Sequence, residues 1–193
     1  LIYETLRVDF DRHAGLARLK IIGPAAQPPR NLDEWIAGAV TCWPLALARA
    51  LDDALLHLRA NETRLGLLIL TTEGDLDHVA AHDSFLVENL DHWLVREIVL
   101  YWTRTLKRLD VSSRTIFTLV EPGSCFAGLL AEFLFAADRT YMLDGAMEED
   151  PRPAPLIRLS AMNFGPLTMP NGLTRLATRF LGEPDLFAAA PEL

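Results

Sequence analysis

Apolar and polar residues alternate in two stretches near the start of the chain. Residues 3–10 (YETLRVDF) and 16–22 (LARLKII) place apolar side chains mainly at every second position, and His13, Ala14 and Gly15 lie between them. Such alternation is typical of half-buried strands, and a short link containing Gly joins antiparallel neighbours. The sequence therefore predicts a β-hairpin.

A helical spacing follows the Pro-rich loop 23–31. One amphipathic helix is predicted to start near Pro44 and to end near Asn61, since proline favours the first turn of a helix. A second long helix is predicted over residues 80–109. The apolar residues on its inner side are Phe85, Leu90, Leu94, Ile98, Trp102, Leu106 and Leu109.

Continuous apolar runs at 65–70 (LGLLIL) and 114–120 (RTIFTLV) predict buried strands. Further strands are predicted at 139–143 and 155–160, a buried helix from about residue 128 and a short helix at 173–181. The acidic, Pro-rich segment 144–155 is predicted to be a mobile loop. Alternation of buried strands with helices favours one α/β domain over residues 1–193, with parallel pairing and helices packed outside.

Composition and net charge argue against some classes of partner and location. The formal net charge of −8 argues against a nucleic-acid or membrane-surface partner. No apolar run reaches the roughly 20 residues of a membrane-spanning helix, and the start has no signal-peptide pattern. Because the first residue is Leu, we expect a fragment of a longer chain. Cys42 and Cys125 lack metal-ligand spacing, which suggests reduced thiols and a cytoplasmic location.

Two strand-to-helix turns are candidates for chemistry. The turn TTEGDL follows the strand at 65–70, and GSCFAG follows the strand at 114–120. The carboxyl ends of neighbouring parallel strands are where ligands bind in open α/β folds, and two converging backbone N–H groups form an oxyanion hole. The alternative is that each glycine serves only the backbone angles of a tight turn and that the helix is simply buried.

The second turn and its helix carry a family resemblance. The stretch GSCFAGLLAEFLFAAD resembles the signature G-G-G-x-E-L-A-x-x-x-D of the crotonase (enoyl-CoA hydratase/isomerase) superfamily, anchored on Glu132 and Asp138 with one extra loop residue. The stretch LSAMNFGPLTMPNGLTRLATRFLG is similar to the family block that begins L-P-E-V, and 73–76 (EGDL) stands where the family has G-A-D-L. This resemblance implies a crotonase-like spiral of ββα units.

The resemblance also implies roles for particular residues. The carbonyl of an acyl-CoA thioester would be held by backbone N–H groups of Gly74 and of Gly128 or Leu129, with Glu132 as acid or base. Cys125, Phe126 and Ala161 would line the substrate site; no metal ligand and no cofactor is implied beyond the coenzyme A of the substrate. Ala161 stands where hydratases of the family carry a second glutamate. A pocket plugged by Phe126 or Met162 would indicate a structural role.

Within the superfamily, the stretches WPLALARALDDALLHLR, LDVSSRTIFTLVEPGSCFAG and AADRTYML most resemble lyases that open an oxidised benzoyl-CoA ring with water in aerobic aromatic degradation. Those chains carry two crotonase-like modules, and this segment resembles the second. The implied partners are a benzoyl-CoA-derived substrate, the missing N-terminal module and further copies in a homo-oligomer. The alternative function is a degenerate, non-catalytic module with a structural or oligomerisation role.

Several side chains keep two interpretations at this point. Glu132 is either a buried acid/base or a brace between helix and loop, and Cys125 is either a thiol of lowered pKa or a buried inert one. His78 and His82 have the spacing of metal ligands, but solvated helix positions are favoured. Arg175 is read as an ion-pair or capping residue.

Overall fold

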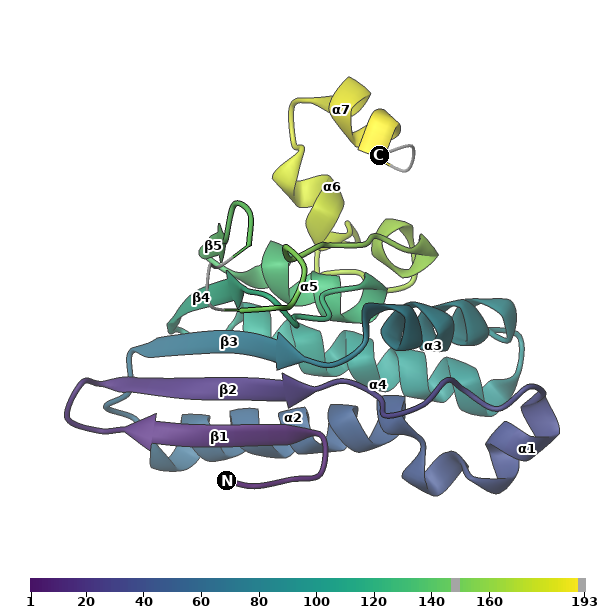
Figure 1. Cartoon of the computed structure of the whole chain (residues 1–193), viewed down its shortest axis with the longest axis horizontal. Coiled ribbons are helices and arrows are strands. Elements are labelled where there is room, and N and C mark those ends of the chain that lie inside the picture. The colour runs from purple at the N-terminus through teal and green to yellow at the C-terminus, as the bar shows by residue number, and fades with distance from the viewer. Residues whose placement is uncertain (147–149, 191–193) are drawn as a thin grey trace.

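The computed structural model describes residues 1–146 and 150–190, and within them one five-stranded sheet is covered by helices (Figure 1). Its strands lie in chain order: β1 (Leu6–Asp11), β2 (Leu16–Ile22), β3 (Leu67–Glu73), β4 (Thr115–Val120) and β5 (Arg139–Met142). The first pair is antiparallel and each later pair is parallel. The predicted α/β class and the predicted hairpin are confirmed.

The hairpin has one buried and one exposed face. Leu6 and Leu19 are fully buried, whereas the next residues along, Arg7 and Lys20, point to solvent. The chain reverses at Gly15, whose φ of 73° lies in the left-handed region that glycine adopts without strain. The alternating pattern therefore fixes which face of this pair of strands meets the core.

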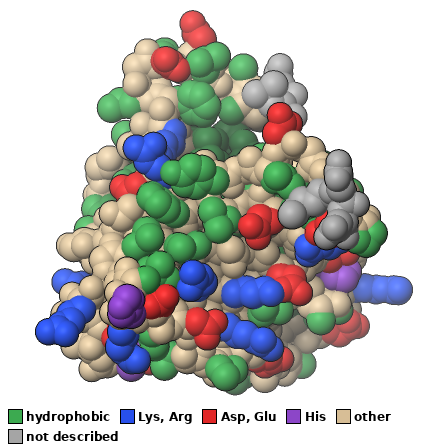
Figure 2. Space-filling view, turned by 60° about the vertical axis from the view of Figure 1, so that its left-hand side comes forward, with side chains coloured by type: hydrophobic (Ala, Val, Ile, Leu, Met, Phe, Trp, Pro, Cys, Tyr) green, Lys and Arg blue, Asp and Glu red, His purple; other side chains and the backbone are tan. Residues whose placement is uncertain are grey.

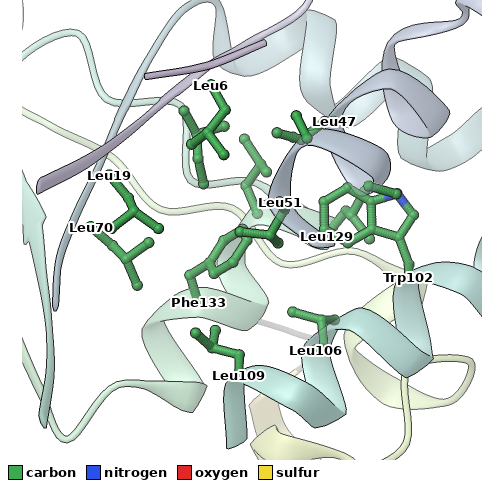
Figure 3. Packing of buried hydrophobic residues seen from close by; sticks show 14 of the residues in the cluster. Leu6, Leu19, Leu47, Leu51, Leu70, Trp102, Leu106, Leu109, Leu129 and Phe133 are labelled. Atoms are coloured by element: carbon green, nitrogen blue, oxygen red, sulfur yellow. The ribbon is translucent and has the colours of Figure 1, made fainter. Parts of the chain in front are cut away.

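Two long helices lie behind the first three strands in Figure 1. They are α2 (Trp43–Asn61) and α4 (Trp93–Asp110). The indole N–H of Trp102 donates to the carbonyl of Pro44 at 2.8 Å, which joins the two helices inside the core. Figure 3 shows side chains from the sheet, α2, α4 and the later helix α5 (Gly128–Ala136) converging on this core. The labelled residues are Leu6, Leu19, Leu47, Leu51, Leu70, Trp102, Leu106, Leu109, Leu129 and Phe133.

The prediction of one helix over 80–109 is wrong. The chain forms α3 (Leu76–Glu88) and α4, which are separated by four residues. The side-chain amide of Asn89 donates to the carbonyl of Phe85 at 2.8 Å and so caps the C-terminal end of α3. Leu90 and Leu94 continue the helical spacing of apolar residues across the break, which is why periodicity alone did not reveal it.

Helix α5 (Gly128–Ala136) is deeply buried, and all of its first seven residues are buried. The segment predicted as a strand at 155–160 is not one. It makes an isolated bridge between Arg158 and Ala127, beside the start of α5. The segment crosses the N-terminus of α5 instead of joining the sheet. Ala127 is therefore its one bridge partner among the described residues.

The remaining elements are short. They are α1 (Leu32–Ala37), η1 (Ala39–Thr41), η2 (Ala161–Phe164), α6 (Arg175–Arg179) and α7 (Pro184–Ala189). The helix predicted at 173–181 is therefore shorter than expected, and α1 and α7 were not predicted. Of the predicted mobile loop 144–155, residues 147–149 lie outside the described residues, and the described remainder forms no helix or strand.

The surface includes an apolar groove. Figure 2 shows hydrophobic side chains gathered between the broad base of the molecule and its narrow top. A groove of about 820 Å³ is lined by the segment from the end of α5 to β5, by residues 157–159, by α6 with Phe180 after it, and by Ala190 at the end of α7. None of the site residues predicted from the sequence lines it. No described helix is long and apolar enough to cross a bilayer.

Candidate functional site

The two predicted turns lie side by side at the carboxyl ends of β3 and β4. Gly74 directly follows β3, and its N–H donates to the carbonyl of Gly123 in the next turn at 3.2 Å. A Cβ on Gly74 would lie 3.0 Å from the Cα of Gly23 and 3.3 Å from the Sγ of Cys125. Three chain segments therefore meet at this point, and the absence of a side chain allows their close approach.

Cys125 and Phe126 are fully buried in the second turn. The backbone N–H of Cys125 donates to the hydroxyl of Thr72 at 2.8 Å, so the turn is fastened to β3. Burial raises the pKa of the Cys125 thiol to about 11. This supports the alternative of an inert buried cysteine and opposes the hypothesis of a lowered-pKa thiol.

The backbone donors at the start of α5 already have acceptors inside the protein. The N–H of Gly128 donates to the carbonyl of Arg158 at 2.9 Å. The N–H of Leu129 donates to Oδ2 of Asp83 at 2.7 Å. Together with Gly74, all three candidate oxyanion-hole donors are therefore hydrogen-bonded to other groups of the chain.

Asp83 is a buried carboxyl that the sequence reasoning missed. It lies on α3, is 0% exposed, and also accepts a hydrogen bond from the hydroxyl of Ser160 at 3.0 Å. Burial raises the pKa of Asp83 to about 7, while its bonds to Leu129 and Ser160 oppose that rise. A signal was present: Asp83 shares the helical spacing of the core residues Val79 and Leu86.

Glu132 lies one turn further along α5 and is fully buried. Its Oε1 accepts from the side-chain amide of Asn163 at 2.7 Å, and its Oε2 accepts from Arg175 at 3.0 Å. Burial raises the pKa of Glu132, and the bonds to Asn163 and Arg175 counteract this. The carboxylate therefore braces α5 to η2 and α6, which is one of the two interpretations of this residue.

Arg175 connects this carboxylate to a second one. Its guanidinium, 1% exposed, makes a bidentate pair with Asp110 of α4 at 2.9 and 2.6 Å. The predicted ion-pair role of Arg175 is confirmed. Because one guanidinium is the counter-charge of two buried carboxylates, loss of Arg175 would leave both of them without a positive partner.

Asn163 completes the network and was not singled out from the sequence. Its amide also donates to the carbonyl of Gly128 at 2.8 Å, and its Oδ1 accepts from the N–H of Ser160 at 3.0 Å. One amide side chain thus joins η2 to the first turn of α5. The neighbouring Ala161 is exposed, and Met162 is fully buried.

The two histidines of α3 hold the Pro-rich loop. A ring nitrogen of His78 lies 3.3 Å from the carbonyl of Pro24, and one of His82 lies 3.1 Å from the carbonyl of Ala26. His82 is only 6% exposed, so the prediction of a solvated position is wrong for it. Among the described residues, no cluster of three or more His, Cys, Asp or Glu side chains is arranged to hold a metal ion.

These features define an α/β chain with two adjoining strand-to-helix turns and a buried carboxylate network behind the second one. The chain is 44% identical over 187 residues to benzoyl-CoA-dihydrodiol lyase from Aromatoleum evansii, which covers 97% of this chain and 33% of that protein. It thus spans about a third of the relative's length. The resemblance to such a lyase, predicted from sequence motifs, is confirmed.

Solved structures give more distant matches. Pseudomonas aeruginosa AtuE matches 74% of this chain and 49% of its own, with 16% identity and a TM-score of 0.48. An enoyl-CoA hydratase from Shewanella pealeana matches 72% of this chain and 46% of its own, with 14% identity and a TM-score of 0.43. No protein-family model matches the chain.

Proposed function

We propose that this chain is one module of a longer CoA-thioester lyase that opens an oxidised benzoyl-CoA ring with water. The observation that carries the proposal is the 44% identity to benzoyl-CoA-dihydrodiol lyase over nearly the whole chain. Because the chain corresponds to only a third of that relative, the remaining two thirds would supply the other module and the rest of the enzyme.

Within that enzyme we propose a supporting role for this module. A thioester oxyanion needs free N–H donors aimed at one point in a dry pocket. Here the donors of Gly74, Gly128 and Leu129 are engaged by protein acceptors, and Glu132 is bonded on both oxygens. Ala161 offers no carboxylate at the second position. The alternative in which these residues hold the thioester would require the Gly74 bond and the bond of either Gly128 or Leu129 to break.

A chimeric enzyme tests the proposal. The aligned third of the Aromatoleum evansii lyase is replaced by this chain, and lyase activity is measured in the purified chimera. We expect turnover within about tenfold of the parent, a change of about 1.4 kcal/mol in the barrier. A folded chimera without activity would count against membership in such an enzyme.

The same chimera separates the supporting role from the catalytic one. Glu132→Gln keeps the volume of the side chain but removes its charge. A supporting module predicts that this variant unfolds more easily while the folded fraction keeps its kcat. A kcat lowered by 100-fold or more at unchanged folded fraction would instead place Glu132 among the catalytic residues, as an acid/base contribution of that size is typical.

A further inference from the structure

A Pro-rich segment lies against α3 with few bonds of its own. We call residues 24–30 (PAAQPPR) the strap; it runs from Gly23, which packs beside Gly74, to Asn31, the N-cap of α1. Among the described residues, no backbone N–H or carbonyl of the strap pairs with another backbone group. Its three prolines have no N–H to donate, and they restrict its backbone. The strap is therefore held in place by side chains.

Two histidines of α3 provide the hydrogen bonds of the strap. Nδ1 of His78 lies 3.3 Å from the carbonyl oxygen of Pro24, and Nε2 of His82 lies 3.1 Å from that of Ala26. Because a carbonyl only accepts, each of these ring nitrogens carries the hydrogen. Within the described part of the chain, these are the two hydrogen bonds between the strap and the rest of the protein. The closed position of the strap thus depends on two side chains one helical turn apart.

His82 is placed so that its contact depends on pH. Its side chain belongs to a residue that is 6% exposed, and the centroids of its ring and of the Trp43 ring are 5.5 Å apart. Since Nε2 already carries a hydrogen, a second proton has to bind at Nδ1, which has no hydrogen-bond partner among the described residues. The result would be an imidazolium in a largely buried position. The closed strap therefore favours the neutral ring.

The acidic residues near His82 on α3 do not compensate such a charge. Asp83 is the next residue, but its carboxyl faces α5 and accepts from the N–H of Leu129. Asp75 caps the start of α3 by accepting from the backbone N–H of His78. The ring of His78, one turn away, adds a second positive charge when it is protonated.

The other elements around the ring bring no negative charge either. Trp43 of α2 is uncharged, the strap presents a carbonyl, and the charged residue of the strap, Arg30, is exposed. Asp77 of α3 is exposed and paired with Arg158. Burial lowers the pKa of His82, the bond to the strap opposes this, and the charge of the histidine one turn away lowers it further.

We propose that residues 24–30 form a pH-responsive strap, which His78 and His82 hold closed and which opens when His82 is protonated. The inference does not rest on the proposed lyase function. Because the closed state binds the His82 proton more weakly than the open one, opening becomes more favourable as pH falls below about 6.5, the ordinary pKa of histidine. Below that value the ratio of open to closed strap rises by up to about tenfold per pH unit, until the closed form is itself protonated. Above it, the strap stays closed.

Trypsin cleavage after Arg30, the exposed last residue of the strap, tests the proposal. The cleavage rate is measured by mass spectrometry at about pH 7.5 and about pH 5.5, one unit on either side of the ordinary pKa of histidine. Each rate is divided by that of a synthetic peptide of residues 24–36 at the same pH, which removes the pH dependence of trypsin. We expect this ratio to be about tenfold higher in the acidic sample. Cleavage after Arg18, within β2, should not rise, because the sheet stays folded.

Two matched variants identify the titrating group. His82→Gln retains an amide donor for the carbonyl of Ala26 but does not titrate, so the ratio for Arg30 should no longer change with pH. His13→Gln removes an exposed histidine from the turn between β1 and β2, and this variant should keep the change seen in the wild-type chain.

The outcomes that overturn the proposal are distinct from those that test the lyase function, because no CoA compound takes part. An equal rise in the wild-type chain and in His82→Gln would overturn it, and so would a wild-type ratio that does not change with pH. A parallel rise at Arg18 and Arg30 would show unfolding instead of strap release.

An NMR titration of the His82 ring in the wild-type chain provides a second measurement if His82→Gln does not fold. We expect a midpoint below about 6.5, because the closed strap disfavours the charged ring. A midpoint at or above the ordinary value would contradict the proposal.

Discussion

At the scale of single residues, a buried network of charged and amide side chains joins α5 to α4, η2 and α6. Glu132 and Asp110 share one guanidinium, and Asn163 bonds both the Glu132 side chain and the backbone of Gly128. Exposed ion pairs contribute little to stability, whereas an uncompensated buried charge is costly. The residues that resemble a catalytic signature are therefore expected to matter first for folding.

Arg175→Ala tests this expectation. The substitution leaves the carboxylates of Glu132 and Asp110 without their counter-charge, and we expect a loss of about 3–5 kcal/mol in the free energy of unfolding. Urea denaturation measures the change. Arg158→Ala is the control, since Arg158 pairs with Asp77 at the surface and its loss should cost about 1 kcal/mol or less. Equal losses in the two variants would contradict a buried network.

Asp83 predicts a pH dependence with a definite sign. Its pKa is near its ordinary value in the unfolded chain and about 7 in the folded one. Between about pH 4 and pH 7 the folded state therefore holds the proton more tightly, and stability falls as pH rises, by up to about 1.4 kcal/mol per pH unit. The contribution is constant below and above this window.

Comparison with Asp83→Asn isolates that contribution. The free energy of unfolding of both proteins is measured from about pH 4.5 to about pH 8. This range covers most of the window in which Asp83 titrates. Relative to the wild-type chain, the variant should become more stable as pH rises. Glu132, whose pKa is also raised, is present in both proteins. Parallel stability curves would show that Asp83 does not titrate in this range.

At the scale of elements, the N-terminus of α5 is where backbone conformation and side-chain chemistry depend on each other. Gly128 starts the helix at positive φ and leaves the space that Asp83 fills. Arg158 crosses in front of it: its carbonyl accepts from the N–H of Gly128 at 2.9 Å, and its N–H donates to the carbonyl of Phe126 at 3.1 Å. The segment that resembled a strand is thus shaped by the helix terminus that it covers.

Gly128→Ala is expected to be strongly destabilising. The new methyl group overlaps the Asp83 carboxylate, so either the carboxylate or the helix start must move, at roughly 2–5 kcal/mol for overpacking plus the lost cap. Chemical denaturation measures the effect. Gly66→Ala provides the control, because nothing lies within 4 Å of its Cβ position and its φ is not in the left-handed region. Comparable losses for both would contradict the close approach.

Local pattern predicted the hairpin, the strands β3 to β5 and the helices α2 and α5, because each presents a clear apolar period. It failed between α3 and α4, where the apolar spacing of Leu90 and Leu94 continues although the helix ends before Asn89, whose side chain bonds the carbonyl of Phe85. It also failed at Asp83 and Asn163. The spacing of Asp83 with Val79 and Leu86 indicates a buried position, but no local signal specifies its partner Leu129, 46 residues away, or the partner of Asn163, Glu132, 31 residues away.

At the scale of the whole molecule, the sheet and its crossover helices bring the two strand-to-helix turns together, as the sequence predicted. The same packing engages their N–H groups internally. Two observations have to be explained together: the similarity to about a third of a lyase, and the internal hydrogen bonds of the candidate oxyanion-hole donors. Both follow if this module supports an enzyme whose chemistry lies elsewhere in the longer chain.

The most direct test is a calorimetric titration of benzoyl-CoA into this chain, with free CoA as the control and circular dichroism to establish that the chain is folded. We predict no saturable binding that depends on the benzoyl group, because the N–H groups of Gly74, Gly128 and Leu129 already have acceptors. Saturable binding that prefers benzoyl-CoA to free CoA would contradict this account and would show that the two turns form a working thioester site.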